Sequence, residues 1–472
     1  MAQDVAGLAQ FPAGAAPACR SPGARTMFRR GLARCAPLAI VAGQAQRYVA
    51  CDGKGRETNP ASSSRRGSGI RVAYSVRQSH GRGVWYPEAP TIFTGALDDP
   101  EEFQKRVTVF SGNTNRALAE ATCECLGIPL GCAEISTYDD GEIKIQVERV
   151  RRKQVYVISP VCRGDGIGVN DSLMELLLLV STLNRASAAE VTAIIPYYGY
   201  GISDHKEKSG VPIAASDVAH MLTAMGVARV VAVDLHGPQI SGFFPPRVPV
   251  EVLSSGPLGA FYFSTKNLSR PVVVSPDEDS VVRAKEFYTA MRKHAGQQCG
   301  MAMIVRQRGR EGDMELVGSV DGADCIIVDE IVASGERICE VAAFLKKRGA
   351  KRVFGFATHC LIRGQQKPSE GLSKAVPLLG PLHSGSRRES VHSDLLTGNC
   401  DLEELVVTDS APLSAEAARI PMLKQITLAP LLAEVIKRLQ CHGTLLDLFE
   451  LNPGQSTWSK SPELGLRKKD KS

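Results

Sequence analysis

The chain has 472 residues, of which 43% are hydrophobic and 22% are charged, as is typical of globular proteins. No stretch approaches the roughly 20 consecutive apolar residues that a membrane-spanning helix requires, so we expect no membrane partner. The net charge of +6 is concentrated in residues 1–90, which carry thirteen Lys and Arg against four acids and leave the rest near −3, so we expect no nucleic-acid partner.

The first 106 residues differ in composition from the rest of the chain. They are rich in Ala, Gly, Ser and Arg, and no helix or strand period is sustained before about Val107, which predicts a largely disordered or targeting extension. The composition is typical of a transit peptide, and a solvated tail or a mispredicted gene start is the alternative. With a solvated tail or a mispredicted gene start, we expect a cytoplasmic protein. With a transit peptide, the alternative is the mitochondrion or plastid. Residues 456–472 form a basic tail, and the thirteen cysteines, without CxxC pairs, fit a reducing compartment.

From Val107 onward, short runs rich in Val and Ile alternate with stretches of helical period. The runs are VTVFSG, QVYVISPV and EVTAIIPYYGY, and the helical stretches are residues 116–126 and SLMELLLLVSTL. This alternation predicts βαβ units, and so a mainly parallel sheet with helices on both faces. Ligands of such sheets bind at the carboxyl ends of the strands, so we expect functional residues directly after each run.

The chain also repeats itself. GVARVVAVDLH, from Gly226 to His236, and GAKRVFGFATH, from Gly349 to His359, each follow a similar helix, DVAHMLTAM or EVAAFLKKR. The repeat indicates duplication of a domain of about 120 residues. We predict two tandem domains, residues 107–256 and 257–455. In the second, residues 363–399 are rich in Ser and Gly and lack periodicity, which predicts an inserted surface loop.

Several segments resemble one known family in order and spacing, from about Val107 to Glu450. They are VNDSLMELLLLV, PYYGY, DLHGPQISGFF, VVSP with Asp277, and KKRGAKRVFGFATH, and they are similar to ribose-phosphate pyrophosphokinases and the synthetase-associated proteins. The resemblance implies two tandem type I phosphoribosyltransferase-like domains, each a mainly parallel sheet flanked by helices. It also implies oligomers and transfer of a pyrophosphoryl group from ATP to the anomeric hydroxyl of ribose 5-phosphate.

The resemblance implies Mg²⁺ as the cofactor, because a metal ion must neutralise the triphosphate. By the family's pattern its protein partners would be His236, in DLHGPQISGFF, and Asp277, in SPDEDS. Where the family has paired glycines after this Asp, the chain has Asp279 and Ser280, which add side chains and a negative charge beside the phosphates.

The family's ATP site is implied by two segments. A loop contributed by a neighbouring subunit corresponds to TYDDGEIKIQV, in which the matching residues are Tyr138, Asp140 and Glu142. Tyr138 could stack on adenine. The family's Arg-Gln-Asp triplet after the aromatic-rich strand reads Ile202, Ser203 and Asp204 here, so only Asp204 is retained and a cationic donor fork is lost.

The ribose 5-phosphate site is implied by a strand that ends in two acids and continues into a phosphate-binding turn. The residues that match are Asp329, Glu330, Ser334 and Gly335. Ala333 replaces an Asp of the family pattern, Glu336 replaces a Gly, and Arg337 replaces a Thr. We expect Glu336 to bring a carboxylate into the phosphate cradle and to weaken phosphate binding by roughly a hundredfold or more, unless Arg337 compensates for it.

Two basic residues are implied in catalysis, where positive charge meets the phosphorus oxyanions of the transition state. The strand MAMIV leads into Arg306 and Arg308, which take the places of the family's Lys and Arg. Arg306 keeps the charge of the Lys but changes the shape of the donor.

Three functions remain open at this point. The chain is a non-catalytic or weakly active subunit that assembles with an intact PRPP synthetase, or an active ribose-phosphate diphosphokinase, or a module that binds a nucleotide or sugar phosphate for another role. By the resemblance, the expected ligands are ATP and ribose 5-phosphate, and the expected assembly is a homo-oligomer or a hetero-oligomer with an intact PRPP synthetase.

Overall fold

The computed structural model describes residues 100–441 except 207, 296–297, 307–313, 363–394 and 396–399, together with residues 76–78, 84–87 and 445. The chain divides into two units, Met1–Gly67 and Ser68–Ser472, and all described residues belong to the second. Most of the predicted extension, the predicted loop at 363–399 and the tail at 456–472 lie outside the described residues. Below, the N-terminal half means residues 107–256 and the C-terminal half residues 257–455.

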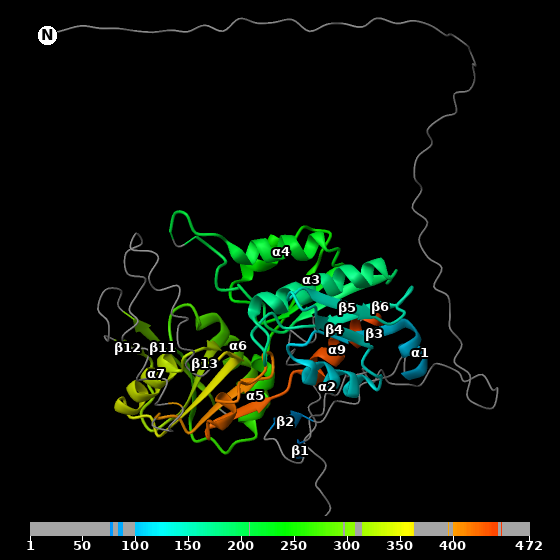
Figure 1. Ribbon diagram of the computed structural model, residues 1–472. Helices are drawn as coiled ribbons and strands as arrows, with labels where there is room; N and C mark the ends of the chain where they lie inside the picture. Colours follow the sequence, from blue (N-terminus) through cyan, green and yellow to red (C-terminus); the bar gives the residue numbers. More distant parts are fainter. Residues whose placement is uncertain are drawn as a thin grey trace, which may run out of the picture. The chain divides into compact units, whose positions relative to one another are not determined.

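The N-terminal half contains a five-stranded parallel sheet (Figure 1). Its strands, in spatial order, are β3 (Val107–Ser111), β6 (Gln154–Ile158), β7 (Glu190–Ile195), β8 (Arg229–Val233) and β9 (Val250–Leu253). Its helices are α2 (Arg116–Leu126), α3 (Val169–Arg185), α4 (Ala214–Ala224) and the 3₁₀ helix η2 (Pro238–Phe243), and α1 (Pro100–Arg106) precedes β3. A separate antiparallel hairpin joins β4 (Ala133–Thr137) to β5 (Ile143–Val147). The strands and helices expected from the alternating pattern are therefore present.

The C-terminal half provides seven strands of a nine-stranded sheet. The spatial order is β1 (Val76–Gln78), β2 (Val84–Pro87), β16 (Leu423–Ile426), β15 (Glu404–Thr408), β14 (Arg352–Cys360), β13 (Asp324–Val332), β10 (Pro271–Ser275), β11 (Gly300–Arg306) and β12 (Met314–Val317). Only the edge pairs β1–β2 and β11–β12 are antiparallel. The helices are α5 (Gly256–Ser264), α6 (Val281–Ala295), α7 (Glu336–Lys347), α9 (Ala429–Gln440) and the 3₁₀ helix η3 (Ala417–Arg419).

Two strands come from the segment predicted to lack regular structure. β1 and β2 extend the C-terminal sheet, and β2 pairs in parallel with β16. The segment expected to be largely disordered or a targeting extension therefore contains two short strands among its described residues. The β-prone sequence Val84-Trp85-Tyr86 pairs with a sheet edge that would otherwise leave backbone groups unpaired.

Helices cover both faces of each sheet, as predicted. α3 and α4 pack on one face of the N-terminal sheet through side chains such as Leu179 and Leu222, and α7 packs on the C-terminal sheet through Val341 and Leu345. The two repeated segments hold equivalent places. In the N-terminal half, α4 connects the neighbouring strands β7 and β8, and in the C-terminal half, α7 connects the neighbouring strands β13 and β14. The fold is therefore α/β, with two halves that each contain a mainly parallel sheet flanked by helices.

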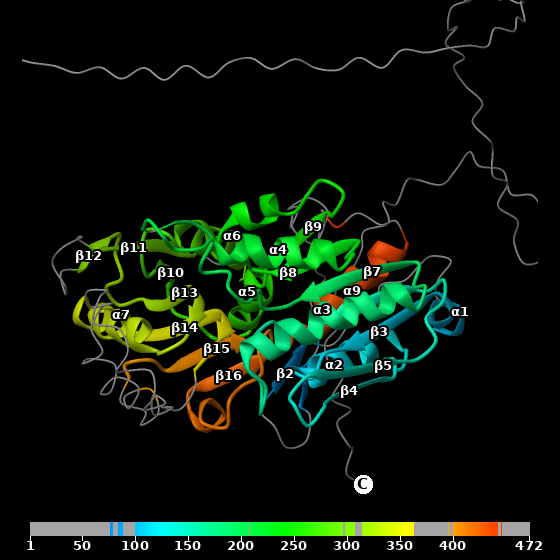
Figure 2. The same ribbon diagram turned by 45° about the horizontal axis from the view of Figure 1, so that its top comes forward.

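The opposite faces of the two sheets share one apolar cluster. It combines residues such as Val109 and Val231 of the N-terminal half with Phe263, Phe354 and Val406 of the C-terminal half. Helix α9 contributes to the same cluster and lies against α2 of the N-terminal half (Figure 2). The Gln440 side chain donates a hydrogen bond to the Tyr156 hydroxyl of β6 at 2.7 Å. The last described helix is therefore packed on the first half. Among the described residues, no helix is long and apolar enough to span a membrane.

Candidate active site

A cleft of about 730 Å³ opens where the carboxyl ends of β8, β10 and β13 meet. This volume is within the range of small-molecule sites. It is lined by the segment after β8, the turn between β10 and α6, and the turn between β13 and α7. Seven of the residues expected in the site line it, namely Asp204, His236, Asp277, Asp329, Glu330, Ser334 and Gly335. The fold therefore brings together residues that are more than a hundred positions apart in the sequence.

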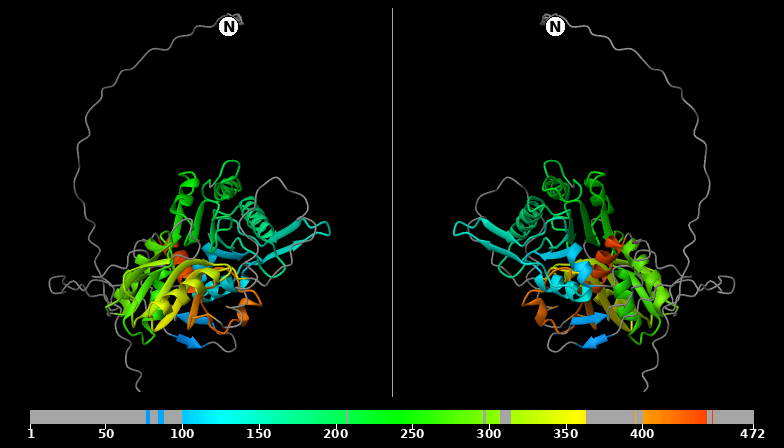
Figure 3. Two further views of the ribbon diagram at one scale, coloured as in Figure 1. Left: turned by 90° about the vertical axis from the view of Figure 1, so that its left-hand side faces the viewer. Right: turned by 90° about the vertical axis from the view of Figure 1, so that its right-hand side faces the viewer.

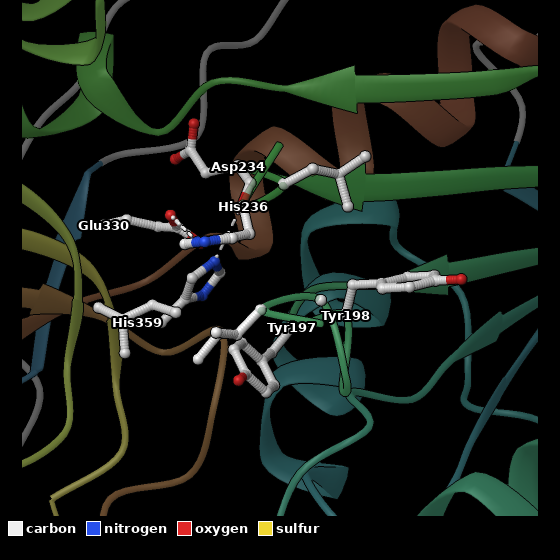
Figure 4. Close-up of a pocket in the computed structure, with 10 residues that line it drawn as sticks. Tyr197, Tyr198, Asp234, His236, Glu330 and His359 are labelled. Carbon is white, nitrogen blue, oxygen red and sulfur yellow. Dashed lines mark hydrogen bonds and ion pairs between the residues drawn. The ribbon is translucent and has the colours of Figure 1, made fainter. Parts of the chain in front are cut away.

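His236 follows β8 and faces Glu330 of β13 across the cleft. Its Nδ1 lies 2.9 Å from Glu330 Oε2 (Figure 4). This hydrogen bond raises the pKa of His236, although partial burial opposes the shift. Glu330 also accepts a hydrogen bond from Arg283 Nη2 at 3.1 Å. The carboxylate of Glu330 is thus held between the His236 ring and the Arg283 guanidinium.

Asp234 ties the two halves together directly behind the cleft. Its backbone is in the left-handed region at φ 41°, which turns the chain sharply at the end of β8. Its Oδ2 accepts hydrogen bonds from Ser255 Oγ at 2.6 Å and from Thr358 Oγ1 of β14 at 2.8 Å. Its Oδ1 lies 3.8 Å from Arg283 Nη1. Arg283 therefore lies between an acid of each half.

His359 ends the second copy of the repeat and lies close to His236, which ends the first (Figure 4). Burial lowers the pKa of His359. Its Nε2 donates to the carbonyl oxygen of Asp234 at 3.1 Å, and its Nδ1 lies 2.8 Å from Ser410 Oγ, which donates to the carbonyl oxygen of Thr358. Between the two histidines and Tyr197 lies a small space of about 10 Å³, which holds no more than one water molecule.

Arg337, at the start of α7, bridges two acids of the cleft. Its Nη1 donates to Asp277 Oδ2 at 2.6 Å, and its Nη2 donates to Asp329 Oδ1 and Oδ2 at 2.5 and 2.6 Å. Burial raises the pKa of Asp329, while Arg337 opposes this shift. The carboxylates of Asp329 and Asp277 outweigh the effect of burial on Arg337 and raise its pKa. Arg337 is therefore a permanently charged fork held on a buried carboxylate.

The turn before α7 places Ser334 and Gly335 at the cleft. Gly335 has φ 81°, a left-handed conformation that suits glycine, and its Cβ position lies 2.2 Å from a methyl group of Leu395. The Ser334 hydroxyl accepts a hydrogen bond from the Glu336 amide at 3.3 Å. Glu336 itself does not line the cleft. The charged side chain that enters the cleft from this turn is that of Arg337.

Sequence and structure comparisons identify the relatives of this architecture. Residues 107–226 match the N-terminal domain of ribose phosphate pyrophosphokinase, and residues 258–378 match the phosphoribosyl transferase domain. The ribose-phosphate pyrophosphokinases of Burkholderia pseudomallei and Xanthomonas campestris are 38% and 39% identical to this chain. The first match covers 72% of this chain and 96% of the relative, and the second 73% and 98%. This chain belongs to the ribose-phosphate pyrophosphokinase family.

A solved structure from the same family supports the fold. Phosphoribosylpyrophosphate synthetase from Mycobacterium smegmatis aligns with a TM-score of 0.58 and 27% sequence identity, over 72% of this chain and 100% of that chain. The part of this chain that the relatives do not cover is therefore an addition to a complete ribose-phosphate pyrophosphokinase fold.

The residues expected at the ATP site lie in two separate places. Asp204 is buried in the cleft, where it accepts a hydrogen bond from Gln239 Nε2 at 2.6 Å. Tyr138 is 53% exposed, in the turn of the β4–β5 hairpin that projects from the N-terminal half (Figure 3). Asp140 and Glu142 are exposed in the same turn, and none of these three lines the cleft. Within one chain, the cleft therefore lacks the aromatic platform expected from the family.

Arg306, one of the two basic residues expected in catalysis, does not line the cleft either. Arg306 ends β11, and its Nη1 donates to Glu340 of α7 at 3.4 Å. Arg308 lies outside the described residues. The positions of both relative to a substrate remain predictions.

Asp277 as it is arranged here does not fit a directly bound Mg²⁺. Its Oδ1 accepts a hydrogen bond from the Ser280 amide at 2.8 Å, and its Oδ2 accepts from Arg337. The Nδ1 of His236 is taken by Glu330. Among the residues that the structure describes, no three His, Cys, Asp or Glu side chains are grouped as a metal site. Mg²⁺ prefers several free oxygen ligands, which this pair does not offer.

The sequence did not identify Arg283, Asp234 and Gln239 as parts of the site. Asp234 and Gln239 lie within the segment DLHGPQISGFF, which indicated where the site is but not these two residues. Arg283 gave no signal of its own, because an arginine in the first turn of a helix usually faces solvent.

Proposed function

We propose that this chain is a ribose-phosphate pyrophosphokinase family member with little activity of its own, which acts as a regulatory or weakly active subunit of a PRPP synthetase complex. Its ligands would be those of the family, ATP and ribose 5-phosphate, and its partner an intact synthetase. The cleft between the halves is the proposed site for these ligands.

The observation that carries this proposal is the position of Arg337. The acids at the end of β13 are the groups expected to accept the ribose hydroxyls. Both oxygens of Asp329 are bonded to Arg337, and Glu330 is bonded to Arg283 and His236. A sugar would have to displace the guanidinium, and its hydroxyl groups would bring no positive charge to the buried Asp329 carboxylate in exchange. Ribose 5-phosphate should therefore bind weakly.

Three further replacements in or near the cleft reduce its donors and acceptors. Ile202 lines the cleft with a 56% exposed apolar side chain, where the family pattern has a cationic fork. Ala333 lines it without a carboxylate, and Asp279 adds negative charge beside Asp277. Each change acts on a separate contact with the ligands, so their effects should accumulate.

The test is a turnover assay of the full chain, alone and mixed with an intact synthetase. Removing one positioned donor usually costs on the order of 10² to 10³ in rate, so the chain alone should turn over ATP and ribose 5-phosphate at least about a hundredfold more slowly than the intact synthetase. In the mixture, the two chains should co-elute and the activity per intact subunit should change. A normal family rate for the chain alone would contradict the proposal.

The alternative is an active ribose-phosphate diphosphokinase. It is favoured by the gathering of His236, Asp277, Asp329 and Glu330 in one cleft, and by relatives that match over almost their whole length. In that case Arg337 must release Asp329 when the sugar binds. The same assay separates the two functions, because the alternative requires a normal rate without any partner.

A further inference from the structure

A cationic group, the Arg337 guanidinium, already lies between the carboxylates of Asp277 and Asp329. Asp277 lies in the turn after β10 and Asp329 lies on β13, and the proximity of their carboxylates would be unfavourable without a positive charge between them. Arg337 supplies that charge through three hydrogen bonds of 2.5–2.6 Å, two of them to one carboxylate. Arginine cannot lose its proton in proteins, so this charge is independent of pH.

All four oxygens of the pair are engaged by the protein. Asp277 Oδ1 accepts from the Ser280 amide at 2.8 Å, and Asp329 Oδ1 accepts from the Glu330 amide at 2.8 Å in addition to Arg337. The remaining oxygen of each carboxylate is bonded to the guanidinium. A divalent ion could reach these oxygens only if Arg337 moved away. Asp329 is only 2% exposed, which adds the cost of leaving a buried carboxylate unpaired during the exchange.

The backbone fixes Arg337 in this place. The side chain of a residue in the first turn of a helix leans toward the helix N-terminus, which here is the turn after β13. Gly335, with φ 81°, sets the direction in which α7 leaves that turn. Arg337 is thus anchored by the same turn that ends the strand of Asp329, only eight residues away.

We propose that Arg337 is the resident cation of the Asp277–Asp329 pair and takes the place of a divalent metal ion there. The chain therefore holds this part of its cleft without Mg²⁺, and no metal ion binds at Asp277 while Arg337 is present. This inference deepens the proposed function, since it names the group that fills the site, but it concerns metal binding and not turnover.

The experiment measures the binding of Mn²⁺ alone to the full chain by electron paramagnetic resonance. Wild type and Asp277→Asn should bind Mn²⁺ equally, because Asp277 is not a ligand in either. Arg337→Thr should gain one site, at least tenfold tighter than any wild-type site, and Arg337→Thr with Asp277→Asn should lose it again. Arg116→Thr, which removes an exposed partner of Glu120, is the matched control and should gain no site.

A second readout is thermal unfolding in EDTA and in Mg²⁺. The melting temperature of wild type should be the same in both. That of Arg337→Thr should be lower in EDTA and rise with Mg²⁺, because a ligand that binds only the folded state stabilises it. Arg337→Gln serves if the Thr variant does not fold.

Two results would overturn the inference. One is Mn²⁺ binding by wild type that Asp277→Asn removes, and the other is a folded Arg337 variant that gains no site. Either result leaves the proposed function to its own assay. Conversely, a normal rate of turnover with no Mn²⁺ bound at Asp277 would contradict the proposed function and leave this inference intact.

Discussion

Arg283 forms ion pairs with one buried acid of each half. It lies 3.1 Å from Glu330 of the C-terminal half and 3.8 Å from Asp234 of the N-terminal half, and both acids are buried. Replacing Arg283 by Met would leave two buried carboxylates with one cation fewer. Since its side chain is 20% exposed, we expect a loss of roughly 2–4 kcal/mol in the free energy of unfolding, measured in urea.

A double-mutant cycle tests whether this cost comes from the charge pair. Combining Arg283→Met with Glu330→Gln should recover about 1–3 kcal/mol relative to the sum of the single changes, because the neutral amide no longer needs a cation. The control pair is Arg116 and Glu120 on the surface of α2, with side chains 60% and 56% exposed, for which we expect a coupling below about 0.5 kcal/mol. Equal couplings for the two pairs would contradict the prediction.

At the residue scale, the sequence located the site better than it described its contacts. Motifs placed His236, Asp277, Asp329 and Glu330, and all four line one cleft. Which charged side chain would enter the cleft from the turn before α7 could not be read from sequence, because Glu336 and Arg337 are neighbours. Their directions differ by the rotation of one helical residue, which only the structure fixes.

At the scale of elements, Asp409 connects the starts of two helices. Its Oδ1 accepts from the amide of Leu428, which caps α9, at 2.7 Å, and its carbonyl accepts from Asn115, which caps α2, at 2.7 Å. Burial raises the pKa of Asp409 from 3.8 to about 6, although the hydrogen bonds that it accepts oppose the shift. The carboxyl therefore holds its proton more tightly in the folded chain than in the unfolded chain.

This raised pKa predicts a specific pH dependence of stability. Between about pH 4 and pH 6 the folded state binds more protons at Asp409 than the unfolded state, so the contribution of this group to stability falls as the pH rises. Asp409→Asn keeps an oxygen acceptor for Leu428 and cannot ionise. The free energy of unfolding of the variant minus that of wild type, measured in urea, should therefore be about 2 kcal/mol larger at pH 7 than at pH 4.5. The exposed Asp401→Asn should show no such difference.

The elements themselves were largely predictable from the sequence, and their partners were not. The helix expected at residues 116–126 and the strands after Val107 follow from local period and composition. Helix α9 has an ordinary amphipathic sequence, so nothing local indicates that it packs on α2. The pairing of β2 with β16 likewise joins segments more than 300 residues apart, and the part of the chain that holds β2 has an atypical composition.

At the scale of the whole described chain, a large apolar cluster belongs to both halves. It contains Phe263, Phe287 and Phe356 of the C-terminal half together with Val109 and Val231 of the N-terminal half. The ring centroids of Phe287 and Phe356 lie 5.2 Å apart. Two further clusters are separate, one around Leu179 in the N-terminal half and one around Leu345 in the C-terminal half. Opening either half therefore exposes the shared cluster and should destabilise the other.

We predict that the two halves unfold as one cooperative unit. Leu345→Ala removes a fully buried side chain from the cluster that only the C-terminal half contains, and should cost about 2–5 kcal/mol. Native-state hydrogen exchange should then show the same loss of protection for amides of β7, in the N-terminal half, as for amides of β13. Leu179→Ala is the matched change in the N-terminal half, and it should likewise lower the protection of the β7 amides and of the β13 amides by equal amounts. If Leu345→Ala weakens protection in β13 alone, the halves open independently, and the shared cluster does not couple them.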